Sequence, residues 1–151
     1  MTSTRCLVVT LALAACSRSP SPAPEAAPGP SAEAPTYRVA LEPGPGPGAL
    51  SLRLTARPPF HVNGEFPLSF TPDGASTVRF DGARVALTPA ERTPCDGSAA
   101  DACAVRAGLP FTAPAPGPAR VSGTVSFSVC NPEHCLLHKQ ALAQTVDIPG
   151  A

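Results

Sequence analysis

Residues 125–148 read VSFSVCNPEHCLLHKQALAQTVDI, and the pattern of this segment sets the expected fold class. Val125, Phe127 and Val129 alternate with serines, which is the period of a half-buried β-strand. The alternation returns in residues 142–148, where Leu142, Val146 and Ile148 are the large apolar side chains. The segment therefore predicts two strands with Cys130 and Cys135 at the turn between them.

The same period appears upstream of this segment. Residues 50–54, 65–71 and 121–129 alternate in this way, and residues 78–87 carry Asp-Gly at their centre, which predicts a further hairpin. No segment has a helical apolar stripe, and 21 prolines interrupt most windows in which a helix could form. The sequence thus predicts an all-β fold, a two-sheet antiparallel β-sandwich of about eight strands. Its core is expected to contain Leu50, Leu52, Leu54, Phe66, Leu68, Phe70, Val125, Phe127 and Val129.

The N-terminus has the features of an export signal. Arg5 is followed by the apolar run CLVVTLALAA and then by Cys16, and the run is too short to span a membrane. The sequence LAAC at 13–16 resembles the lipobox of bacterial lipoproteins, which implies that residues 1–15 are removed and that Cys16 is acylated. Ser17 after the cysteine favours the outer membrane. An ordinary secretory signal with a chance cysteine is the alternative.

The rest of the chain divides into a tether and one domain. Residues 16–35 are rich in Pro, Ala and Ser and have little to bury, so they predict an extended tether from Cys16. Residues 36–151 have the length of one domain. Acidic and basic residues number 11 each without a basic stripe, which argues against nucleic acid as a partner. We expect a monomer that uses no cofactor and is attached to the membrane by lipid.

Four cysteines remain in the predicted domain after Cys6 is cleaved and Cys16 is acylated. In an exported protein they are expected to form disulfides, and four cysteines allow three pairings. Short turns bring sequence neighbours within disulfide distance, which favours Cys95–Cys103 and Cys130–Cys135. Cys130 shares the polar strand face of Ser126 and Ser128, so its sulfur is expected to be accessible to an attacking thiolate.

The hairpin around Cys130 and Cys135 resembles the end of the periplasmic N-terminal domain of the thiol:disulfide interchange protein DsbD. Residues 50–70, LSLRLTARPPFHVNGEFPLSF, and LPFT at 109–112 are also similar to strands of that family. The resemblance implies an immunoglobulin-like β-sandwich on the periplasmic side of the membrane. It also implies that Cys130 and Cys135 exchange disulfides with thiol proteins of the periplasm.

In the same family a loop shields the redox cysteines, and residues 89–108 correspond to it. This segment carries Cys95 and Cys103, so their disulfide could stiffen a cover over the hairpin or exchange with the pair beneath it. This chain also departs from the family after the second cysteine. The family often has two prolines, or an aromatic residue and prolines, at this place, whereas this chain has LLHK at 136–139.

Two other interpretations of the cysteines remain open. Both disulfides could be braces in a non-catalytic domain that binds other envelope components. The segment CNPEHCLLH could also offer four metal ligands, Cys130, His134, Cys135 and His138, although its spacing fits no strict metal motif. His134 could tune a neighbouring thiolate, because an imidazolium lowers a cysteine pKa. His61 is expected to be a surface residue. No hydrolase triad or phosphate-binding loop has recognisable spacing.

Overall fold

The computed structural model describes residues 27–96 and 98–150. The predicted signal segment, Cys16 and most of the predicted tether lie outside these residues. The described chain contains strands and no helix, so the predicted all-β class is confirmed. Among these residues there is accordingly no helix long and apolar enough to cross a membrane. The strands are β1 (Ser31–Ala34), β2 (Tyr37–Pro43), β3 (Leu50–Ala56), β4 (His61–Val62), β5 (Ser69–Pro72), β6 (Val85–Ala86), β7 (Glu91–Cys95), β8 (Ser98–Leu109), β9 (Gly117–Cys130) and β10 (Cys135–Ile148).

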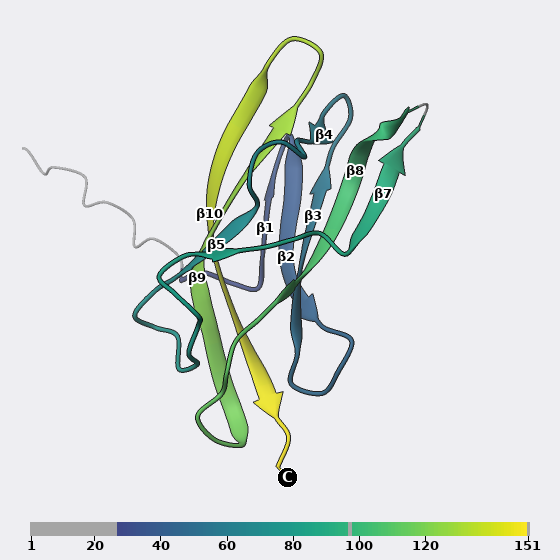
Figure 1. The fold of residues 1–151 in the computed structure, drawn as a ribbon. Helices are drawn as coiled ribbons and strands as arrows, with labels where there is room; N and C mark the ends of the chain where they lie inside the picture. The colour runs from purple at the N-terminus through teal and green to yellow at the C-terminus, as the bar shows by residue number, and fades with distance from the viewer. Residues whose placement is uncertain (1–26, 97, 151) are drawn as a thin grey trace, which may run out of the picture.

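The longest element of the fold is the antiparallel hairpin of β9 and β10 (Figure 1). Its register runs without a break from Cys130 opposite Cys135 at the turn to Gly117 opposite Ile148 at the far end. The alternating apolar residues of β9 are buried, as the sequence predicts. Because the register is continuous, the two cysteines are fixed at the tip of a rigid two-stranded ribbon.

All strand pairs are antiparallel, and in the described residues hydrogen bonds join ten strands into one sheet, where the sequence predicts about eight strands in two sheets. Within this sheet β4 connects two groups of strands. One group has the order β1-β2-β3-β8, and β7 also pairs with β8. In the other group β9 pairs with β10 and with β5, and β5 pairs with β6. Val62 of β4 pairs with Ala102 of β8 and with Val129 of β9. The short strand β4 therefore lies between the β7–β8 hairpin and the tip of the β9–β10 hairpin, at the same end of the molecule (Figure 1).

One hydrophobic cluster contains buried side chains from both groups of strands. Leu52 and Leu54 of β3 are fully buried in it, together with Phe127 of β9 and Phe70 of β5. The ring of Tyr37 on β2 meets the ring of Phe127 edge-on, with centroids 4.7 Å apart. Of the predicted core residues, all are buried except Phe66, which is half-buried.

The predicted hairpin over residues 78–87 is wrong. Val85–Ala86 form β6, which pairs with β5 rather than with residues 78–80. Arg79 instead forms an isolated bridge with Thr112. Asp-Gly at 81–82 does form a bend, but the partners of the flanking residues lie elsewhere in the chain. At this position, pairing with residues distant in the sequence overrides the local preference for a hairpin turn.

The structure adds strands that the sequence pattern did not identify. Residues 31–34, expected to belong to the tether, form β1 and pair with β2. Ala32 and Ala34 pack against the core, so small side chains suffice once the backbone is paired. Residues 89–108, expected to be a shielding loop, largely form β7 and β8. The polar face of β9 is also less exposed than expected, because Ser122 and Ser128 are buried.

Candidate functional site

A tight turn joins Cys130 to Cys135 at the hairpin tip. The side chain of Asn131 accepts hydrogen bonds from the backbone N–H groups of Glu133 and His134, at 3.0 and 2.9 Å. The backbone N–H of Asn131 donates to the carbonyl of His134 at 3.0 Å, which closes the turn. Asparagine favours such turns because its side chain can hydrogen-bond to the backbone two residues on.

The structure joins Cys130 to Cys135 and Cys95 to Cys103, the pairing that the sequence favours. The two residues of the hairpin pair are not equally accessible. Cys135 is exposed, whereas Cys130 is only 6 % exposed. The expectation that the sulfur of Cys130 is accessible is therefore wrong: β4 pairs alongside this residue, with His61 opposite Cys130, and covers that edge of β9.

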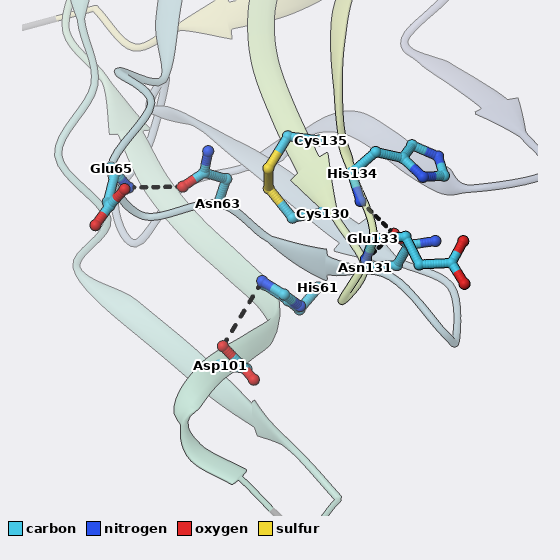
Figure 2. Close-up of a disulfide and its surroundings, with 9 residues drawn as sticks. All are labelled: His61, Asn63, Glu65, Asp101, Cys130, Asn131, Glu133, His134 and Cys135. Carbon is cyan, nitrogen blue, oxygen red and sulfur yellow. Dashed lines mark hydrogen bonds and ion pairs between the residues drawn. A yellow bond between two sulfur atoms is a disulfide. The ribbon is translucent and has the colours of Figure 1, made fainter.

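His134 and His138 point to different surroundings. The ring of His134 lies 5.9 Å from that of Phe60, and Figure 2 shows it directed away from the sulfur atoms. The ring of His138 packs against Tyr37 at 4.6 Å, and burial lowers the pKa of this imidazole. The four residues of the metal interpretation are thus not gathered, and the two sulfurs are already bonded to each other. Within residues 27–96 and 98–150, no group of three or more potential ligands could hold a metal ion.

His61 is the residue to which the sequence assigned a surface position and no functional role. It lies opposite Cys130 in the register of β4 and β9, so the two side chains share one face of the sheet. Its Nε2 is 3.7 Å from a carboxylate oxygen of Asp101 on β8. Figure 2 shows His61 between Asp101 and the disulfide. The alternation around His61 predicts an outward side chain, but only the pairing of β4 reveals which cysteine it faces.

An open groove brings these groups together. It is lined by His61, Asp101 and both cysteines of the hairpin tip, with Glu65 and Arg92 as further charged residues. A second groove adjoins it and is lined by His61 and Asp101 again, together with Cys95 and Cys103. His61 and Asp101 thus border both disulfides.

The Cys95–Cys103 disulfide lies beside the hairpin tip rather than over it. Because β4 separates β8 from β9, the backbones of these two strands are about 9.5 Å apart at this level. Direct exchange between the two disulfides needs contact between sulfur atoms, so this spacing disfavours it. The pairing of β7 with β8 is irregular near Pro94 and Cys95, and a cross-link there is suited to bracing the hairpin.

Comparison with known proteins gives no family assignment. No family model matches the chain, and neither a curated protein nor a solved structure matches it significantly.

Proposed function

We propose that the protein is a lipoprotein on the periplasmic face of a bacterial membrane, held at the outer membrane by acylated Cys16, and that it exchanges disulfides with thiol proteins through Cys130 and Cys135. The domain is proposed to be an immunoglobulin-like sandwich similar to the N-terminal domain of DsbD. The shared core of the two strand groups supports this arrangement.

The observation that carries the proposal is the unequal exposure of the two bonded cysteines. Cys135 is exposed at the tip of a long hairpin, so a thiolate of another protein can approach its sulfur. Cys130 is buried beside β4. Thiol–disulfide exchange needs one accessible sulfur to attack and a second sulfur to leave, and accessibility decides which sulfur is attacked.

The reaction follows from this asymmetry. A thiolate of a dithiol partner attacks Sγ of Cys135, the bond between Cys135 and Cys130 breaks, and Cys130 leaves as a thiolate. The second thiolate of the partner then attacks the partner's own sulfur in the mixed disulfide and releases Cys135. Two electrons have passed from the partner dithiol to the hairpin pair, and the partner holds the disulfide. The reverse sequence of steps oxidises the pair again.

The accessible surface around Cys135 also suits contact with a protein. Leu137 follows two residues later on β10, so its side chain points to the same face. It is 67 % exposed and is the only large hydrophobic side chain found exposed in the described part of the chain. A single exposed leucine is ordinary on a protein surface, and only its place beside Cys135 suggests a contact with the partner.

Trapping of a mixed disulfide tests the proposal. The mature protein with Cys130→Ala keeps the accessible Cys135. It is expected to form a stable mixed disulfide with a thioredoxin variant that retains one active-site cysteine, activated as a mixed disulfide with an aromatic thiol. The Cys135 thiolate attacks the thioredoxin sulfur and the aromatic thiolate leaves. The matched variant Cys135→Ala keeps only the buried Cys130 and is expected to form much less. The double variant Cys95→Ala/Cys103→Ala is expected to retain exchange through the hairpin pair.

Two results would overturn the proposal. One is equal and negligible trapping by both single variants while each remains folded by circular dichroism. The other is a hairpin disulfide that resists excess reduced thioredoxin. Either result would leave two braces in a domain that binds other envelope components without exchange chemistry.

A further inference from the structure

His61 lies next to Cys130, whose sulfur leaves in the proposed exchange, and not next to Cys135, whose sulfur is attacked. Residues directly opposite each other in an antiparallel pair have Cβ atoms about 4.5–5.5 Å apart. His61 is opposite Cys130 in this way, while Cys135 lies on the far side of Cys130, across the β9–β10 pair. An imidazole on β4 is therefore next to the sulfur that becomes a thiolate when the disulfide is attacked.

Asp101 gives this imidazole a charged neighbour. Its carboxylate is 3.7 Å from Nε2 of His61, and the two side chains are partly shielded, with 26 % of His61 and 43 % of Asp101 exposed. The carboxylate is thus a charge partner for the imidazole when the ring carries a proton. Glu65 and Arg92 line the same groove, Asp96 lines the adjoining one, and Glu133 lies in the turn. Of these groups, only His61 is paired in register with Cys130.

We infer that His61 stabilises the Cys130 thiolate released during exchange, with Asp101 as the charge partner of the imidazolium. This inference rests on the proposed exchange function and adds a positioning residue to it. When a thiolate attacks Cys135, the electron pair of the broken bond moves to Cys130. The imidazolium beside it stabilises that negative charge, and a leaving thiol with a more stable thiolate departs faster. His134 takes no part, because its ring lies against Phe60.

The inference can be tested on a single thiol. In the mature protein with Cys135→Ala, Cys130 is the one free thiol of the hairpin and the Cys95–Cys103 bridge stays intact. Its thiolate is followed by ultraviolet absorbance during a pH titration. Adding His61→Gln is expected to move the titration midpoint of Cys130 to higher pH. Adding His61→Lys is expected to keep the midpoint low, because a cation is restored. Adding His134→Gln is expected to have no effect.

A second measurement separates a chemical role from a structural one. Reduction of the oxidised hairpin by dithiothreitol is expected to slow several-fold in His61→Gln near neutral pH. A role through positive charge predicts that the slowing disappears in alkaline solution, because imidazoles in general carry no charge there. A purely structural role of His61 predicts the same slowing at every pH and no rescue by His61→Lys.

The failures of the two proposals can be told apart. If His61→Gln leaves both the midpoint and the reduction rate unchanged while Cys130→Ala still traps thioredoxin, the role of His61 is excluded and exchange stands. If neither single-cysteine variant traps thioredoxin, the exchange function fails. The titration of Cys130 then still reports whether His61 acts on the thiolate.

Discussion

Leu137 is expected to contact the partner protein, because it is exposed close to Cys135 on β10. Replacing it by serine removes an exposed apolar side chain on the face of Cys135 without touching the disulfide. We expect Leu137→Ser to slow exchange with thioredoxin several-fold, because protein docking loses apolar contact. Reduction by dithiothreitol should be unchanged, because a small thiol needs no such contact. Stopped-flow measurements of both reactions check this.

A matched control is available on the same strand. Thr145 is exposed on the same face of β10 but lies far from the turn, so Thr145→Ala should leave both rates unchanged. Equal slowing of both reactions by Leu137→Ser would instead mean that the substitution disturbs the turn, and docking through Leu137 would be excluded.

His138 predicts a pH dependence of stability. Its ring packs against those of Tyr37 and Phe127, its Nε2 is buried without a hydrogen-bond partner, and burial lowers its pKa below the usual value. The unfolded chain therefore binds a proton at higher pH than the folded protein does. The free energy of unfolding should be fully retained above about pH 6.5 and should fall as the pH drops below that value. Tyr37 titrates far from this range, since burial raises its pKa.

Substitution of His138 measures how much of the pH dependence of the free energy of unfolding comes from this residue. His138→Phe keeps an aromatic ring against Tyr37 and Phe127 and removes the titrating group. Urea unfolding at neutral and mildly acidic pH should show a shallower pH dependence for His138→Phe than for the wild type. His134→Gln should keep the wild-type slope, because His134 is exposed. Identical slopes in wild type and His138→Phe would contradict the assignment.

At this scale the sequence predicted the Cys130–Cys135 disulfide but not its surroundings. The short spacing of Cys130 and Cys135 between two alternating segments is a local signal. The neighbours of His61 are distant in the sequence, because Cys130 lies on β9 and Asp101 lies on β8. The burial of Cys130 likewise depends on β4, so strand parity alone wrongly predicted an accessible sulfur at Cys130.

Among the strands, β9 depends on one glycine. A Cβ atom added at Gly123 would overlap the carbonyl oxygen of Thr71 and would lie 2.6 Å from Cζ of Phe70 on β5. Gly123→Ala should therefore force β5 away from β9 and lower the free energy of unfolding by about 1–3 kcal/mol. Urea unfolding monitored by circular dichroism measures this change.

Gly108 is the matched control for this substitution. It also lies within a long strand, β8, but a Cβ atom there would meet nothing within 4 Å. Gly108→Ala should change the free energy of unfolding by no more than about 0.5 kcal/mol. Equal effects at both glycines would show that close approach between β5 and β9 is not what requires Gly123.

The strands that were missed share weak local patterns. Residues 98–109 contain five alanines, and Val105 and Leu109 are their only large aliphatic side chains, so the alternation is weak. Strand β8 forms because β3 pairs along one edge and β7 along the other. Residues 31–34 are a similar case, since β1 is defined by its pairing with β2. Pairing partners distant in sequence, rather than side-chain periodicity, define these elements.

For the whole molecule, attachment to a membrane remains a prediction from the N-terminal sequence. Cys16→Ala removes the proposed acylation site, and each acyl CH₂ buried in the bilayer contributes about 0.8 kcal/mol to anchoring. Expressed in a Gram-negative host, the wild type should be found with the outer membrane. The Cys16→Ala variant should be found in the soluble periplasmic fraction or remain uncleaved.

Cys6 supplies the control for this experiment. It lies in the segment that is predicted to be removed, so Cys6→Ala should leave the membrane fraction and the mature mass unchanged. Recovery of wild-type protein without an acyl modification by mass spectrometry would contradict the lipoprotein assignment and leave an ordinary secretory signal.

The sequence by itself determined the all-β class, most of the buried core, and the hairpin that carries Cys130 and Cys135, because period-2 alternation and short turns are encoded by neighbouring residues. Only the tertiary structure decided which cysteine is accessible, that His61 and Asp101 border both disulfides, and that β4 joins the two groups of strands. These features depend on contacts between residues far apart in the chain. Such contacts form only when the whole fold offsets the loss of chain entropy, so no short sequence pattern records them.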